Sequence, residues 1–105
     1  MRTLSFVISG QKIERDPKCD FSGVVSNSRG YLAAKFRFSE DWMGCKKVAI
    51  FSCCGKDYPT PLVDNTCEIP AEALVSNSVQ VALVGQRGTY RITTNTVSFH
   101  QSVGR

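Results

Sequence analysis

Five cysteines and a single histidine are the side chains in this sequence that could bind a metal ion or act as nucleophiles. A tetrahedral zinc site gathers four such ligands, and no cysteine pair here has the Cys-x-x-Cys spacing that supplies two of them. We therefore predict no metal and no cofactor, and we expect most of the cysteines to be free thiols that pack as small hydrophobic residues. One disulfide bond between two of the cysteines is also compatible with the sequence. The cysteines are Cys19, Cys45, Cys53, Cys54 and Cys67.

The adjacent cysteines Cys53 and Cys54 could act as a redox pair. Neighbouring residues of a strand point to opposite faces, so we expect these two side chains to diverge. A reactive thiol also needs groups that lower its pKa, and only Lys46, Lys47 and Lys56 lie near in the sequence. The pair therefore does not by itself predict redox chemistry.

Acid–base catalysis would need titratable groups that converge on one place. His100, the single histidine, lies near the C-terminal end, and we interpret it as a surface residue. Glu40 and Asp41 are adjacent, so they diverge on an extended chain and are more suited to a turn. Gly85 and Gly88 have the spacing of a phosphate-binding loop but lie between predicted strands, which favours a hairpin turn. Without any established catalytic motif, we predict a protein that is not an enzyme and has no small-molecule ligand.

The composition is that of a soluble globular domain. A chain of 105 residues has the length of one domain, so we predict a single domain over 1–105. The net charge of +4 is spread over scattered side chains, and only Lys46 and Lys47 are adjacent basic residues. This pattern favours a solvated surface over a nucleic-acid-binding stripe. No apolar run is long enough to cross a membrane or to form a secretory signal, so we predict synthesis in a cytoplasm and no membrane partner.

The stretch 36–51 is the element around which we expect the fold to be organised. Phe36 and Phe38 alternate with polar residues, which indicates a strand with one buried face. A polar corner follows, and its Trp42 is expected to cap one end of the core with its indole N–H on an acceptor. The next run, 48–51, is apolar at every position, which indicates a strand covered on both faces. The predicted structural core residues are Phe36, Phe38, Trp42 and Phe51.

Short alternating segments recur along the rest of the chain. Together they predict seven to nine strands, the number and spacing typical of a sandwich. Asp64 and Asn65 tolerate positive φ and predict a hairpin turn, and Pro70 opens a run that predicts one short helix near 70–75. We expect a flexible tail over 100–105. The further predicted strand segments are 4–9, 21–25, 31–39, 58–63, 66–69, 79–83, 90–93 and 97–99, with part of 11–20 as an edge strand.

Four segments also resemble a known family. The pattern in 36–51, FRFSEDWMGCKKVAIF, and the segment 62–74, LVDNTCEIPAEAL, are similar to the N-terminal β-sandwich domain of phage baseplate upper proteins. The segments 81–85 and 92–95 look like the closing strands of that domain. Together these segments cover roughly residues 31–99. The resemblance implies an all-β, Ig-like antiparallel sandwich that serves as an attachment module in tailed-phage virions and performs no catalysis.

Our first hypothesis is therefore a structural protein of a tailed-phage particle, as a tail, baseplate or decoration component. It would be made in the host bacterial cytoplasm, reside in the virion, and contact other virion proteins and further copies of itself. The alternative is a small phage inhibitor of a host defence protein, with Lys35, Arg37 and Arg91 as the expected partner contacts. Nucleic-acid binding is a third hypothesis, which the scattered basic residues disfavour.

Overall fold

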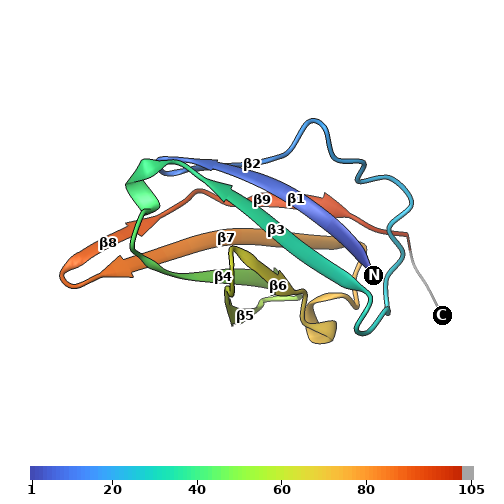
Figure 1. Ribbon diagram of the computed structural model, residues 1–105. Helices are drawn as coiled ribbons and strands as arrows, with labels where there is room; N and C mark the ends of the chain where they lie inside the picture. Colours follow the sequence, from blue (N-terminus) through green and yellow to red (C-terminus); the bar gives the residue numbers. More distant parts are fainter. Residues whose placement is uncertain (103–105) are drawn as a thin grey trace.

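Two β-sheets pack face to face around a shared hydrophobic core (Figure 1). The structure is a computed structural model, and it describes residues 1–102. Almost all of the regular structure in this part of the chain is strand, as predicted. The strands are β1 (Arg2–Ser9), β2 (Lys12–Arg15), β3 (Leu32–Phe38), β4 (Lys46–Cys53), β5 (Lys56–Pro61), β6 (Thr66–Glu68), β7 (Ser78–Arg87), β8 (Tyr90–Thr93) and β9 (Val97–His100).

The pairing of the strands confirms the predicted sandwich. One sheet has the order β2-β1-β3-β6, and the other has the order β5-β4-β7, with β8 and β9 both pairing with β7. The chain crosses between the sheets from β3 to β4, returns from β5 to β6, and crosses again from β6 to β7. The β3–β6 and β4–β7 pairs are both antiparallel, and they correspond to the B–E and C–F neighbours of an Ig-type sandwich.

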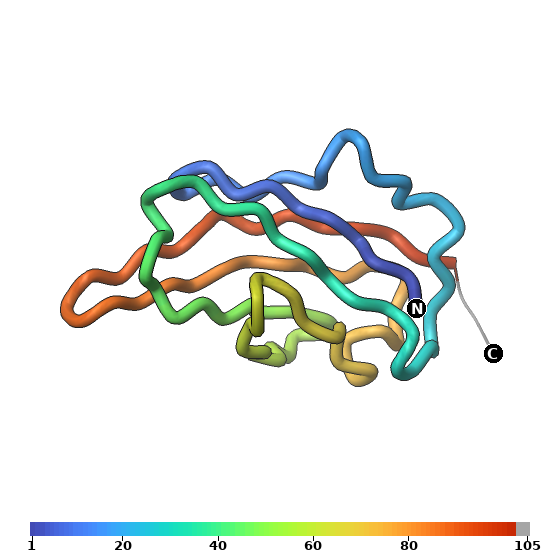
Figure 2. The backbone as a smooth tube through the Cα atoms, viewed as in Figure 1, coloured from blue at the N-terminus to red at the C-terminus, as the bar shows by residue number. Residues whose placement is uncertain are grey.

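One pairing departs from the antiparallel arrangement that we predicted. Strand β1 runs parallel to β3, with Leu4 opposite Ala34 and Phe6 opposite Phe36. Parallel neighbours need a long connection, which the chain supplies through β2 and residues 16–31. Figure 2 shows this connection as the blue-to-cyan path that runs along one end of the sandwich.

That connection contains no strand in 21–25, where a short strand was predicted. Phe21 instead covers the end of the core, with its ring edge-on to Phe6 at a centroid distance of 5.4 Å. Val24 is buried beside it, and Val25 makes only an isolated bridge to Ser102. The apolar residues of this segment therefore cover one end of the hydrophobic core and do not extend a sheet.

Alternation of buried and exposed residues explains why the strands face as they do. On β1 and β3, every second residue is apolar and turns inward. Of the predicted core residues, Phe36, Trp42 and Phe51 are buried, while Phe38 is half-buried at the edge of the core. Phe6 and Phe36 stack on neighbouring strands with ring centroids 5.4 Å apart.

The predicted turn and short helix are both present. Asp64 and Asn65 have φ values of 52° and 61°, and Val63 and Thr66 exchange backbone hydrogen bonds of 2.9 and 3.0 Å across them. The helix is a single 3-10 turn, η2 (Ala71–Ala73). The polar corner before β4 contains a second 3-10 turn, η1 (Glu40–Trp42), which we predicted only as a corner.

The end of the described chain is more ordered than we predicted. His100 is the last residue of β9, and Gln101 is buried with its backbone N–H on the Asn77 carbonyl oxygen at 2.9 Å. Ser102 donates its N–H to Val24 at 2.7 Å. The expected tail is therefore wrong for 100–102, because these residues close the gap between β9 and the 16–31 connection. Residues 103–105 lie outside the described part of the chain.

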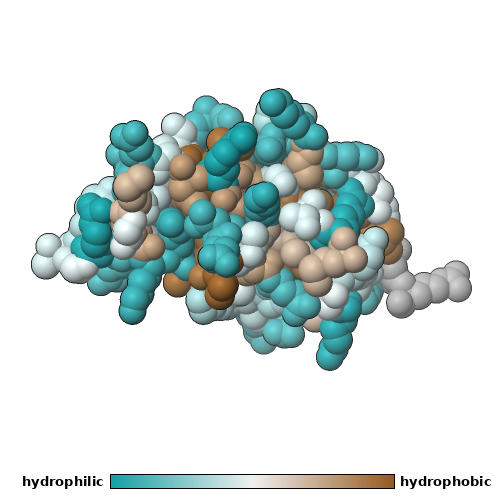
Figure 3. Space-filling view, viewed as in Figure 1, coloured by the Kyte–Doolittle hydropathy of each residue, from teal (hydrophilic) through white to brown (hydrophobic). Residues whose placement is uncertain are grey.

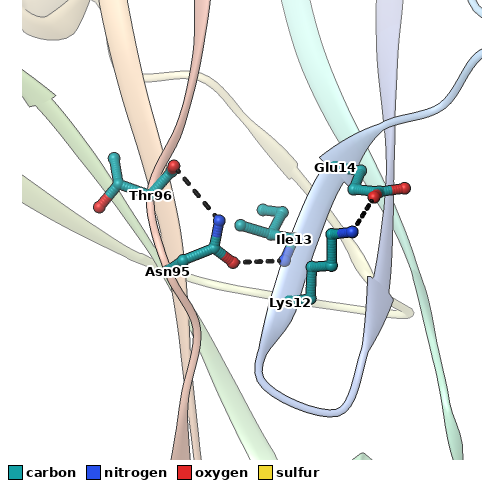
Figure 4. A network of polar contacts seen from close by, with 5 residues as sticks. All are labelled: Lys12, Ile13, Glu14, Asn95 and Thr96. Carbon is teal, nitrogen blue, oxygen red and sulfur yellow. Dashed lines mark hydrogen bonds and ion pairs between the residues drawn. The ribbon is translucent and has the colours of Figure 1, made fainter.

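Two of the edge strands, β5 and β2, have features that protect their free edges. The Leu62 N–H donates to the Lys47 carbonyl oxygen at 3.0 Å. In an antiparallel pair the backbone N–H groups point alternately toward and away from the partner strand, so the backbone nitrogens of residues 59 and 61 of β5 point away from β4. Both positions are proline, which has no N–H to offer on that edge. On the other sheet, Figure 4 shows Asn95 reaching across to β2, where its Oδ1 accepts the Ile13 N–H at 2.8 Å.

Candidate protein-interaction surfaces

The corner at Trp42 joins the two sheets. The indole is completely buried, and its Nε1–H donates to the Gly10 carbonyl oxygen at 2.8 Å, which confirms the expected acceptor. Phe38 packs on the ring at a centroid distance of 5.2 Å. Gly85 of β7 also lies against the ring, because a Cβ there would stand 2.7 Å from the ring atoms Cε3 and Cζ3. The turn predicted over 85–88 is wrong at Gly85, a strand residue that makes room for the indole, and is confirmed at Gly88, which lies in the turn between β7 and β8.

Two hydrogen bonds from β7 and β8 hold the same corner from outside. Tyr90 Oη donates to the Asp41 carbonyl oxygen at 2.9 Å, and the Arg87 guanidinium donates to the Met43 carbonyl oxygen. The guanidinium carbon of Arg87 lies 4.9 Å from the centre of the Tyr90 ring. The corner is therefore fixed by both sheets, which gives the neighbouring surfaces a rigid frame.

The three predicted contact residues do not form one surface. Lys35 and Arg37 lie on the outer face of β3, where both side chains are exposed. Arg91 lies on β8 of the other sheet. Asp16 stands 3.9 Å from the Arg37 guanidinium, a contact too exposed to contribute much stability. Only Lys35 and Arg37 can therefore contact the same part of a partner.

A groove lies beside Lys35 and Arg37, along the part of β3 that β6 does not cover. It encloses about 610 Å³ and has aromatic residues on its floor. Lys47 stands over the Phe38 ring at 4.8 Å from its centre, and the carboxylates of Glu40 and Asp64 are also at the rim. Figure 3 shows this side of the molecule, where hydrophobic atoms are interspersed with hydrophilic ones. The groove therefore has no single sign of charge.

The outer face of the five-stranded sheet has an apolar centre. Val48 and Ile50 of β4 pair with Val84 and Ala82 of β7, and all four are half-buried. Pro61 and Pro59 extend the same face onto β5. We call this set the apolar sheet face; it consists of Val48, Ile50, Ala82, Val84, Pro59 and Pro61. The prediction that β4 is covered on both faces is wrong for the described part of the single chain, because Val48 and Ile50 remain only half-buried on this face.

Polar residues and hollows surround the apolar sheet face. Two hollows of about 510 and 460 Å³ both include Lys46 and Val48 in their walls. Lys46 aligns with Gln86, which pairs with Arg91, at one end of the face. Asp57 lies at the opposite end, where it accepts a 2.6 Å hydrogen bond from Ser52 Oγ. The face therefore has a basic end and an acidic end around an apolar middle.

The cysteines, which all lie in the described part of the chain, are free thiols. Only Cys53 is fully buried, so the expected packing as small hydrophobic residues holds best there. Burial raises the pKa of Cys67 to about 11. The Sγ atoms of Cys53 and Cys54 lie 3.2 Å apart, so the expectation that they diverge is wrong. Cys54 has left the strand and has a φ of 58°, which turns its side chain back toward Cys53.

Metal ligands do not converge among residues 1–102, where no three His, Cys, Asp or Glu side chains are placed to share an ion. Helices in this range are too short to span a bilayer. The sequence signal for the apolar sheet face was the unbroken apolar run 48–51, but its partner Val84 belongs to a strand that we predicted to end at 83. No protein-family model and no curated protein was found to match this sequence.

Proposed function

We propose that this protein is a non-enzymatic attachment module of a tailed-phage virion that acts through protein–protein contacts. The observation that carries the proposal is the apolar sheet face, held on a rigid sandwich and rimmed by polar residues. A clustered apolar surface with a polar rim is characteristic of a protein-binding site. The motifs of 36–51 and 62–74 support the choice of a phage particle as the setting.

The dimensions of this face suit a contact between proteins. The whole outer face of this sheet, including the polar ends beyond the apolar sheet face, spans four strand positions at a spacing of about 4.8 Å and about eight residues at about 3.4 Å each, which gives roughly 500 Å². A standard interface buries about 800 Å² on each partner. The sheet face would supply more than half of that area, and the hollows beside Val48 could admit side chains of the partner.

The first occupant that we propose for the apolar sheet face is a second copy of this chain. A two-fold axis that lies in the plane of the interface, perpendicular to the strands, would reverse the strands of the partner and lay one apolar middle on the other. The same rotation brings the basic end, with Lys46 and Arg91, over the acidic end at Asp57. The charge pattern of the face is thus complementary to itself in this orientation.

Sedimentation of the purified protein tests this contact. We expect a concentration-dependent dimer, and at least a tenfold weaker association for Ile50→Lys and for Val84→Lys. Val7→Lys is the matched control, because Val7 is a half-buried valine on the outer face of the other sheet. Melting temperatures for all three variants separate lost association from lost folding. A monomer at every concentration, or equal weakening by Val7→Lys, would contradict self-association through this face.

The place in a virion has a separate test. Mass spectrometry of purified particles from a phage that encodes this chain should find it at a fixed copy number relative to the other tail proteins. Particles that carry an Ile50→Lys chain should contain less of it. Absence of the wild-type chain from the particles would overturn the proposal.

Inhibition of a host defence protein is the second candidate function. The observation that favours it is the exposed pair Lys35 and Arg37 at the rim of the β3 groove. Immobilised protein would then retain one defence protein in stoichiometric amount from a host lysate, and Arg37→Glu would abolish that retention. Arg91→Glu is the control, since Arg91 lies on the other sheet. Retention of virion proteins alone would support the first proposal.

A further inference from the structure

The two adjacent cysteines at the tip of the β4–β5 hairpin form a close thiol pair. Cys53 is the last residue of β4, and Cys54 with Gly55 makes the two-residue turn, with φ values of 58° and 79°. Because both turn residues have a left-handed backbone, the Cys54 side chain does not continue the alternation of the strand. Its Sγ lies 3.2 Å from that of Cys53, within hydrogen-bonding distance.

The two thiols of this pair have different environments. Cys54 is exposed, whereas Cys53 is only 5% exposed. Burial raises the pKa of the Cys53 thiol, and the neighbouring Cys54 thiol adds to this increase. Reagents in solution can therefore reach Cys54 first. Cys53 is then held beside it in a position to react with whatever is bonded to the Cys54 sulfur.

We propose that Cys53 and Cys54 are a reversible oxidation site that forms an intrachain disulfide with a small-molecule disulfide of the oxidised-glutathione class as oxidant. The Cys54 thiolate attacks one sulfur of the oxidant, which gives a mixed disulfide and releases one glutathione thiolate. The Cys53 thiolate then attacks the Cys54 sulfur and releases the second glutathione. Two protein thiols lose two electrons and two protons, and the oxidant gains them as two thiols.

The product should be easy to reduce, because the backbone constrains it. Consecutive Cα atoms are about 3.8 Å apart across a trans peptide, which is shorter than the separation of about 4.4–6.8 Å in ordinary disulfides. Strained disulfides of this kind have high reduction potentials and are labile. The site would therefore respond to the redox state of its surroundings. This inference stands on the hairpin geometry and does not depend on the proposed function.

The experiment treats the folded, reduced protein with oxidised glutathione and maps the thiols by mass spectrometry after acid quenching. The peptide that contains both cysteines should lose the mass of two hydrogen atoms and carry no glutathione. Cys53→Ser should instead retain one glutathione on Cys54, because the second thiol is missing. Cys54→Ser should react at least tenfold more slowly at position 53, because Cys53 is buried.

A variant that lacks the other three thiols, with Cys19→Ser, Cys45→Ser and Cys67→Ser, should give the same product, and dithiothreitol should reverse it. Stable glutathione on Cys54 of the wild-type chain would overturn the proposal. So would a disulfide between two chains through Cys54, or reaction rates that are equal in the Cys54→Ser variant and the wild type.

Discussion

The indole ring of Trp42 lies directly on the Cα atom of Gly85, so that a methyl group at Gly85 would stand 2.7 Å from Cε3 and Cζ3 of the ring. Trp42 belongs to the corner between the two sheets, and Gly85 belongs to the long central strand β7. The tryptophan can therefore occupy the end of the core only because the strand beneath it has no side chain at this position.

Gly85→Ala should destabilise the fold by about 1–3 kcal/mol, the usual cost of overpacking a core. Chemical denaturation followed by tryptophan fluorescence measures this change. Gln86→Ala, at the exposed neighbour on β7, is the control and should change stability by less than about 0.5 kcal/mol. In a double-mutant cycle, Trp42→Phe should relieve part of the Gly85→Ala cost. Additive costs would show that the ring and the added methyl group do not meet.

Trp42→Ala should cost about 3–5 kcal/mol, since it leaves a cavity at the joint of the sheets. That is a large share of the roughly 5–15 kcal/mol that stabilises a domain, so we expect an unfolded or strongly destabilised protein. Trp42→Phe keeps most of the ring but removes the Nε1–H bond to the Gly10 carbonyl, and its loss should be smaller. Thermal melting by circular dichroism distinguishes the three proteins. A Trp42→Ala melting temperature within a few degrees of wild type would refute this prediction.

Asn95 links the two sheets, and its removal should loosen strand β2. Its Oδ1 accepts the Ile13 N–H at 2.8 Å, and its own N–H bonds to the Gln11 carbonyl oxygen at 3.0 Å. Asn95→Ala keeps the backbone bond to Gln11 but loses the bond from Ile13 and the 3.5 Å bond from Nδ2 to the Thr96 carbonyl oxygen, at a cost of about 1–2 kcal/mol. The Ile13 amide should then exchange with deuterium about tenfold faster. Asn95→Asp retains an acceptor and should restore slow exchange; equally fast exchange in both variants would contradict this role.

Cys67 should make the fold less stable at alkaline pH. In the unfolded chain its thiol ionises near pH 9.0, whereas burial raises the pKa to about 11 in the folded protein. Between these values the native state binds more protons than the unfolded state, so its stability falls as the pH rises. The contribution of the neutral thiol is complete below pH 9 and is lost toward pH 11.

The corresponding measurement compares melting temperatures at about pH 8 and about pH 10.5. Cys67→Ala should show a smaller decrease than the wild type, because the variant lacks the buried thiol. Thr66→Ala, at the preceding residue of β6, changes no ionisable group and should retain the wild-type decrease. Identical decreases in all three proteins would exclude Cys67 as a source of the alkaline loss.

A charge exchange tests the orientation of the proposed dimer. If Lys46 of one copy faces Asp57 of the other, Lys46→Asp and Asp57→Lys should each weaken association by about tenfold, since the contact occurs twice and each exposed pair contributes up to about 1 kcal/mol. The double variant restores opposite charges and should recover most of the affinity in sedimentation. A double variant that is weaker than either single variant would rule out this orientation.

The sequence predicted most reliably the elements that local chemistry determines. Alternation identified β1 and β3, because one face of each is buried, and Asp64 with Asn65 identified a turn that requires positive φ. Pairing order has no such local signature. The parallel β1–β3 pair and the position of Gly85 within a strand follow from long-range contacts that periodicity does not encode.

The interaction surfaces were predicted only in part for the same reason. The apolar run 48–51 pointed to a second apolar face on β4, and that face exists. Arg91 was grouped with Lys35 and Arg37 because all three are exposed strand residues, but membership of a sheet is not visible in the sequence. The divergence of Cys53 and Cys54 was wrongly expected from strand alternation, because Cys54 begins the turn and its positive φ reverses the direction of its side chain.

Pro59 and Pro61 determine what kinds of polymer this protein can form. A strand added to β5 would find no amide hydrogen at either position on its outer side. Lateral growth into an endless ribbon is therefore blocked at that edge, while stacking through the sheet face is not. In a two-fold dimer, each copy buries its sheet face against one neighbour and has no second face of this kind for another copy. Assemblies built in this way have a definite number of subunits, as a particle with a fixed design requires.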